Sequence, residues 1–519
     1  MKRAGDMSEL DKLLAASKKR MERVQAAEQV LSRPAAAPAP APAPAPEPAA
    51  KAVLPSMDSD PTDVAPLFKP VLKPYAVPVL QVAPDDDDPL LAMLDGHDAE
   101  SPSVKELLLG GWVRAHYAHD RACPTAVARW LFAVACHHRR AETSAAAART
   151  LGALLDSSTS PSWVPRPSDF LVALRRHGAD LAELLAGPAA TTDPGAEDAQ
   201  PAAATASSAS TGASSSSATT DESLVDDPRQ NLLATLELLA PCARRWAACG
   251  VGVAERLGAA VWIARLMLEK HTAPAFVHLQ DAFAATLDGA AEAGWTGEWL
   301  PGLLCGLRGL CEALPHTAIV RVHEFLPPTL RASTVQRRAA IDAIGLVAYR
   351  RARQHGAEAR AEAAQRKQQR KAEAEERKAR RESGEEDDED DEEEDDDDDD
   401  EDEEEDKEES VAAPEAPGVE DAGASALAAA LGKVDPSMYK GRMDVLHSLL
   451  VLTNIALSAE PDRMRTDRDA LEDVKRRLAA IKQRAQRYRG VIDYHGLECE
   501  SLASYLGNQI ELLYLEGEE

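Results

Sequence analysis

The stretch CPTAVARWLFAVACHHRRAETSAAAARTLGALLDSSTSPSWVPRPSDFLVALRRHGADLAELL, residues 123–185, decides the fold class of this chain. Its apolar residues recur at intervals of three and four, the spacing that puts side chains on one face of an α-helix. The pattern predicts three or four short amphipathic helices, with no catalytic centre. Their apolar positions are Val127, Trp130, Leu131 and Val134, then Leu151, Leu154 and Leu155, then Leu171, Leu174, Leu181 and Leu184.

A proline-rich connection, SPSWVPRPSDF at residues 160–170, separates the second predicted helix from the third. Its three prolines favour an extended chain, because the residue before a proline avoids the helical conformation. Ser168 is the residue type that caps a helix start, so it is the predicted N-cap of the next helix. We expect Trp163 to pack into a groove between helices, since buried aromatic rings mostly serve packing.

The same helical pattern continues on both sides of this stretch. Residues 231–349 contain successive helical segments with short Gly and Pro breaks, and residues 436–515 contain three more. The last of these has Leu497, Leu502, Tyr505, Leu506 and Ile510 at helical spacing, which predicts a face to bury. Helix after helix without β-rich runs predicts an all-α fold, a helical-repeat (α-solenoid-like) scaffold.

Segments of biased composition divide this scaffold. Few apolar residues, Ala-Pro repeats, Ser/Ala runs and dense charge all favour disorder, because such chains cannot bury enough apolar surface. The predicted organisation is a mostly disordered arm with a basic amphipathic helix and a Pro-rich extended segment (1–88), a first helical block (89–186), a disordered linker (187–227), a second helical block (228–349), a charged helix (350–384), an acidic disordered linker (385–433) and a C-terminal helical block (434–519). We expect the Pro-rich segment to lie along another surface, either of this chain or of a partner.

One tract dominates the formal charge of −30. Residues 385–409 hold 24 acidic residues and one lysine, a charge of −23, which leaves about −7 for the rest of the chain. Such a run is typical of a solvated insertion and also of a segment that binds histones or other basic proteins. We favour the solubilising role and keep histone binding as an alternative.

Three separated stretches together resemble one known family. The first is WLFAVACHH, RTLGALLD and SWVPRPSDFLVALRRHGA within residues 130–179, the second is LPPTLRASTVQRRAA at 326–340, and the third is MDVLHSLLVLTNIAL with GLECESLASYLGNQIELLY within 443–514. In this order they resemble the CANIN domain, which belongs to localisation factor two of the SMC five/six complex and its fungal relatives, the non-SMC element six proteins. The Ser/Ala and acidic insertions depart from that pattern.

The resemblance implies a non-enzymatic adaptor or regulatory subunit that works in DNA repair and genome maintenance. Its implied partners are the SMC five/six complex and a non-SMC element five-like or second localisation-factor partner. It would help to recruit or load the complex on chromatin. The alternatives are a histone-binding nuclear chaperone and a generic helical-repeat adaptor.

Two turns and the N-terminal arm are the candidate partner-binding sites. Arg331, Arg337 and Arg338 form the most basic spot of the predicted folded region, and they are candidates for contact with DNA phosphate. Three arginines fall short of the roughly 6–10 phosphate contacts of a typical DNA-binding protein, so we favour salt bridges to neighbouring helices and leave direct DNA contact open. The candidate residues in the two turns are Trp163, Pro165, Asp169, Phe170, Arg331, Arg337 and Arg338.

No motif of enzyme chemistry occurs in the sequence. There is no P-loop, GxGxxG after a strand, GxSxG or HExxH, and the seven cysteines form no CxxC pair. We therefore expect no enzyme, cofactor or metal, and reduced cysteines. The absence of an 18-residue apolar run and of a signal-peptide core predicts a chain that is neither secreted nor membrane-spanning. The basic cluster RKQQRKAEAEERKARR, 366–381, resembles a nuclear localisation signal and favours the nucleus.

Overall fold

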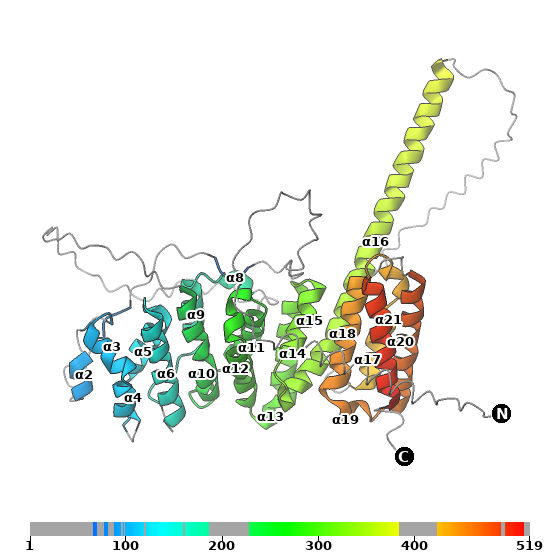
Figure 1. The fold of residues 1–519 in the computed structure, drawn as a ribbon. Helices are drawn as coiled ribbons and strands as arrows, with labels where there is room; N and C mark the ends of the chain where they lie inside the picture. The colour runs from blue at the N-terminus through cyan, green and yellow to red at the C-terminus, as the bar shows by residue number, and fades with distance from the viewer. Residues whose placement is uncertain are drawn as a thin grey trace, which may run out of the picture. The chain divides into compact units, whose positions relative to one another are not determined.

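The computed structural model is mostly helical in the part of the chain that it describes. That part comprises residues 66–69, 77–80, 88–94, 97, 99–118, 121–158, 161–185, 228–383, 423–488 and 494–512. It belongs to one compact unit, Pro61–Glu519. Within the described ranges there is no β-strand, only a single isolated bridge, so the predicted all-α helical scaffold is confirmed (Figure 1).

Most of the helices pack against helices that are near them in the element order, as in a helical repeat. The elements before the first long gap are α2 (Pro89–Leu94), α3 (Pro102–Leu109), α4 (Trp112–Tyr117), α5 (Thr125–His137), α6 (Ala141–Ser157), α7 (Pro167–Arg176) and α8 (Leu181–Leu184). The predicted inward positions of α5, from Val127 to Val134, are all buried. The helical period therefore identified the core face of this helix correctly.

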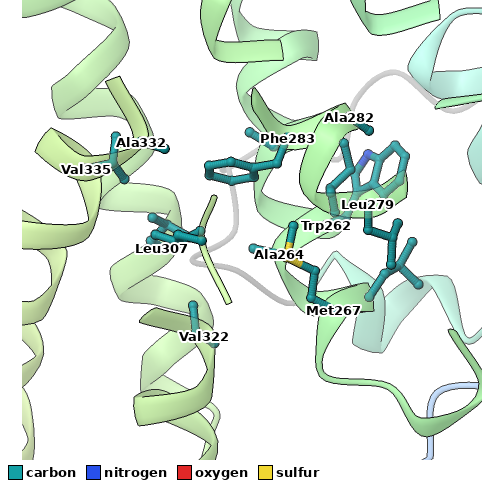
Figure 2. Packing of buried hydrophobic residues seen from close by; sticks show 14 of the residues in the cluster. Trp262, Ala264, Met267, Leu279, Ala282, Phe283, Leu307, Val322, Ala332 and Val335 are labelled. Carbon is teal, nitrogen blue, oxygen red and sulfur yellow. The ribbon is translucent and has the colours of Figure 1, made fainter. Parts of the chain in front are cut away.

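The middle of the chain contains the largest part of the core. Its elements are α9 (Pro228–Glu237), α10 (Leu239–Trp246), α11 (Val253–Met267), η1 (Lys270–Ala275), α12 (Phe276–Asp288), α13 (Glu292–Gly294), η2 (Trp295–Trp299), α14 (Leu300–Glu312), α15 (His316–Glu324) and α16 (Leu330–Ser383). Figure 2 shows Trp262 of α11, Phe283 of α12, Leu307 of α14 and Val335 of α16 among the buried residues of one hydrophobic cluster. Burial of these side chains is the main stabilising contribution.

Two glycines on α14 let this helix approach α11 closely. A Cβ atom at Gly302 would lie 2.8 Å from a methyl carbon of Leu257, and one at Gly306 would lie 2.6 Å from a methyl carbon of Val261. Both distances are shorter than van der Waals contact between carbon atoms allows. The missing side chains therefore set the separation of the two helices.

The last part of the chain packs against α16. Its elements are α17 (Ala424–Gly432), η3 (Pro436–Tyr439), α18 (Met443–Ala459), α19 (Pro461–Met464), α20 (Arg468–Tyr488) and α21 (Tyr494–Ile510). α18 contacts α16, and α20 and α21 pack on each other (Figure 1). The three helices predicted for 436–515 correspond to α18, α20 and α21.

The structure corrects three predicted boundaries. Ser168 is not the N-cap: α7 begins at Pro167, and the Asp169 carboxylate accepts the backbone N–H of Arg166 at 2.8 Å instead. The expected border at residue 349 lies inside one continuous helix, α16, because its charged half continues the helical hydrogen bonds of its apolar half. The assignment of 385–433 to a linker is wrong at its end, where Leu427 and Leu431 of α17 are buried.

Two pieces of the Pro-rich segment lie on this chain's own helices. Leu67 is completely buried, and its backbone N–H donates to the carboxylate of Glu269 at 2.9 Å. Phe68 pairs with Ala179 in the isolated antiparallel bridge, and Leu80 is also buried. The sequence left open whether this segment covers its own chain or a partner, and for the described residues it covers its own chain.

Several other predictions fall outside the described residues. They concern the basic amphipathic helix at 7–33, the Ala-Pro repeat, the Ser/Ala linker at 187–227 and the acidic tract at 385–409.

Candidate interaction surfaces

The turn before α7 is mostly internal. Phe170 is fully buried and packs edge-on against Phe132 and Trp246, with ring centroids 5.2 and 6.5 Å away. Pro165 is buried as well, and its carbonyl accepts the indole N–H of Trp246 at 2.8 Å. Asp169 is used in the start of α7. The assignment of Pro165 and Phe170 to a partner surface is therefore corrected: they join α7 to α10.

Trp163 is half-buried at the rim of the same cluster. Its ring lies edge-on to Phe132 at 5.9 Å, and the guanidinium carbon of Arg129 lies 5.8 Å from its centroid. This is a packing position with one open side, which agrees with the interpretation that we favoured from the sequence. Trp163 is therefore only partly buried, whereas Pro165 and Phe170 of the same turn are buried.

Arg331, at the start of α16, donates hydrogen bonds to backbone carbonyl groups at the C-terminal end of α12. Its guanidinium donates to the carbonyl oxygens of Leu287 and Ala290, both at 2.7 Å, and lies 2.7 Å from the Glu292 carboxylate. It also stacks over Trp295, 5.0 Å from the ring centroid. The carbonyls at a helix C-terminus carry partial negative charge, which accounts for the arginine at this position.

Arg337 and Arg338 point into the interior on the other side of α16. Arg337 is fully buried, and its guanidinium nitrogen lies 2.8 Å from Oε2 of Glu460. The other carboxylate oxygen of Glu460, Oε1, accepts a hydrogen bond from the hydroxyl of Thr334. Arg338 is 9% exposed. Burial lowers the pKa of both guanidiniums, and the Glu460 carboxylate opposes that shift. Arg337 is therefore used in a salt bridge inside the protein, the role that we favoured from the sequence, and Arg338 is buried next to it in the chain.

One group of side chains has metal-ligand chemistry. His447 of α18, together with His495 and Glu498 of α21, places three donor atoms within 4.8 Å of one another. The two imidazole nitrogens lie 4.0 and 3.2 Å from the same Glu498 oxygen. Ligands of one tetrahedral zinc ion lie about 3.3 Å apart, from metal–nitrogen bonds near 2.0 Å, so His447 would have to move. The hydrogen bonding of His495 to Glu498 explains this cluster without an ion.

His323 of α15 is a buried histidine at a small cavity that is also lined by Leu304, Leu307 and Leu346 and by the ion pair of Arg308 with Asp342. Neither ring nitrogen has a hydrogen-bond partner among the described residues. Burial lowers its pKa from 6.5 to about 4. Below pH 6.5 the unfolded chain therefore takes up a proton that the folded chain refuses until about pH 4, and stability falls as the pH decreases through this window.

Replacement of His323 by leucine is expected to remove this pH dependence. Between pH 7.5 and 5.0 the wild-type chain should lose about 2 kcal/mol more unfolding free energy than the variant, since each pH unit below 6.5 contributes about 1.4 kcal/mol. Urea unfolding at the two pH values measures the difference. If both proteins lost the same unfolding free energy, the pKa of His323 would not be lowered in the folded chain. His278, which is 44% exposed, provides the control as His278→Leu.

The exposed apolar side chains of α21 are the surface that the sequence did not reveal. Leu497 and Tyr505, which the sequence placed in the buried face, are 47% and 57% exposed. Tyr494 of the same helix is 70% exposed, and Leu512, two residues after the helix ends, is 63% exposed. These four residues, the α21 stripe, recur at helical spacing on the side opposite to the buried Cys499, Ala503, Leu506 and Ile510. α21 is apolar on both sides, so the hydrophobic period alone cannot tell which side meets the core.

No protein-family model matches the chain, and no curated protein matches it significantly. Among the described residues, none of the helices combines the length and apolar character needed to cross a membrane.

Proposed function

We propose that this chain is a non-enzymatic adaptor subunit that binds the SMC five/six complex and helps to recruit or load it on chromatin in DNA repair. The observation that carries the proposal is the ordered resemblance to the CANIN domain at three separated places. In the structure these stretches are α5 to α7, the turn into α16, and α18 with α21. The proposal also includes a nuclear location, supported by the basic cluster that begins at Arg366 and is exposed on α16.

The arrangement of the helices suits an adaptor. Helical repeats hold side chains on a fixed frame, and partner helices bind such frames through apolar stripes. The α21 stripe is an apolar surface of this kind on one helix, and it lies in a part of the chain that carries the resemblance. We assign it to an amphipathic helix of the non-SMC element five-like or second localisation-factor partner.

Affinity purification from nuclear extract tests the proposal. The intact chain and a copy lacking residues 385–409 are used as baits, with partners identified by mass spectrometry. Recovery of SMC five/six subunits by both baits is the expected result. Histones recovered by the intact chain alone, with no SMC subunit in either sample, would instead support the histone chaperone, for which the run of 24 acidic residues is the specific observation.

Two glutamates introduced into the α21 stripe are expected to weaken recovery of the partner. The variant Leu497→Glu with Tyr505→Glu puts two carboxylates on the proposed contact, where an unpaired charge is costly to desolvate. We expect at least a tenfold loss of the partner, with an unchanged thermal midpoint because both positions are exposed. The control, Val172→Glu with Val277→Glu, changes side chains that are 50% and 63% exposed on α7 and α12. Equal recovery by both variants would exclude the α21 stripe.

A further inference from the structure

The second half of α16 is a helix without packing. From Ala357 to Ala379 every side chain is exposed, and the sequence there is rich in Arg, Lys, Glu and Ala, without an apolar stripe. A solvated helix of this composition is usually held by Glu–Lys or Glu–Arg pairs at i, i+4. Such pairs include Glu362 with Arg366 at 3.9 Å and Lys371 with Glu375 at 4.0 Å. The opposite charges, however, are not mixed evenly around the helix.

The cations gather on one side. With about 100° per residue, the eight basic residues from Arg353 to Lys378 fall in an arc of about 140°, and the five glutamates of this stretch fall in the remaining arc. The two ion pairs lie at the two edges of the basic arc. The residues of this arc, called the α16 basic face, are Arg353, Arg360, Arg366, Lys367, Arg370, Lys371, Arg377 and Lys378, and all are exposed.

We propose that the α16 basic face binds the phosphate backbone of duplex nucleic acid. Its eight cations lie within the range of roughly 6–10 phosphate contacts of a typical DNA-binding protein, which the three arginines at Arg331–Arg338 do not reach. The face is about 38 Å long, close to one turn of the duplex at 34–36 Å. It holds no aromatic residue, so stacking on the bases of a single strand contributes nothing there. The contact is made to the backbone and is independent of base sequence.

The acidic tract at 385–409 of the same chain is expected to compete with the duplex for the α16 basic face. It carries a charge of −23 and follows the face after six residues. Both occupants use the same electrostatic attraction, so salt weakens both. A chain that lacks residues 385–409 is therefore measured beside the intact one, and a tighter duplex complex is expected from the shortened chain.

Fluorescence anisotropy with a labelled DNA duplex of about two helical turns, titrated between about 50 and 200 mM salt, tests the proposal. The variant Arg366→Gln, Arg370→Gln, Arg377→Gln keeps residues that favour a helix. It is expected to lower affinity at least tenfold and to make the salt slope shallower by about 2.7, or 0.9 for each lost contact.

A matched loss of charge elsewhere is the control. The variant Arg465→Gln, Arg468→Gln, Arg476→Gln removes three other exposed arginines, and its affinity should remain within about twofold of wild type. The proposal is overturned if the two variants lose the same affinity for the duplex, or if polyglutamate displaces the labelled duplex as strongly as unlabelled duplex does. It is also overturned if neither the intact chain nor the chain without residues 385–409 binds the duplex. Duplex binding by the α16 basic face does not depend on the proposed function. If the variant Arg366→Gln, Arg370→Gln, Arg377→Gln loses duplex affinity but recovers SMC subunits as the wild type does, the two proposals are separated.

Discussion

Replacement of Phe170 by alanine is expected to lower the free energy of unfolding by about 3–5 kcal/mol, the range observed for large aromatic residues removed from a core. The ring is fully buried between Phe132 of α5 and Trp246 of α10, so its loss leaves a cavity where α5, α7 and α10 meet. Urea unfolding followed by circular dichroism measures the change. The same junction includes the hydrogen bond from the indole N–H of Trp246 to the Pro165 carbonyl. Because the Phe170 ring packs against Trp246, its loss should weaken this hydrogen bond as well.

The matched control is Val172→Ala on the same helix. Val172 is 50% exposed, so its truncation should change the unfolding free energy by less than about 0.5 kcal/mol. The comparison decides between two roles for the turn before α7. If Phe170→Ala were as stable as Val172→Ala and lost only a bound partner, Phe170 would belong to an interaction surface, as its place in the sequence suggested.

Replacement of Glu460 by alanine is the second change with a large expected effect, about 3–5 kcal/mol of destabilisation. It removes the carboxylate 2.8 Å from the guanidinium of the fully buried Arg337, so a positive charge is left in the interior without its counter-ion. Glu460 follows α18 and Arg337 lies on α16, so the loss should loosen the C-terminal helices first. Hydrogen exchange of α18 to α21 and denaturant unfolding measure this effect.

Two further variants make this result specific. Glu312→Ala breaks the 3.4 Å pair with Arg308 by removing a half-exposed carboxylate, and should change stability by about 0–1 kcal/mol. The double variant Arg337→Met, Glu460→Leu replaces both charged side chains by apolar ones. It should recover most of the lost stability, because replacing a whole buried ion pair by apolar residues is often neutral or stabilising. If the double variant were as unstable as Glu460→Ala, the buried charge would not be the cause.

The sequence by itself determined the elements and their class. Apolar residues at intervals of three and four predicted α5, α6, α7 and the helices that follow, since the helical period depends only on local backbone geometry. The preference for salt bridges also agrees with the structure at Arg331 and Arg337, although their partners were unknown. The helix start at α7 was misplaced by two residues, because Pro167 fits the first helical position and Asp169 replaces Ser168 as the capping side chain.

Only the tertiary structure decided which side chains remain outside. Glu460 lies 126 residues after Thr334, which it meets beside Arg337, and no local pattern relates positions so far apart. The burial of Phe170, the exposure of the α21 stripe and the approach of His447 to His495 are decided in the same way. A helix with apolar residues on two sides, or arginines at its start, has the same sequence signal whether its neighbours cover one face or the other. The physical reason is that burial depends on which helices pack together, and that choice depends on the combined area and charge of distant segments.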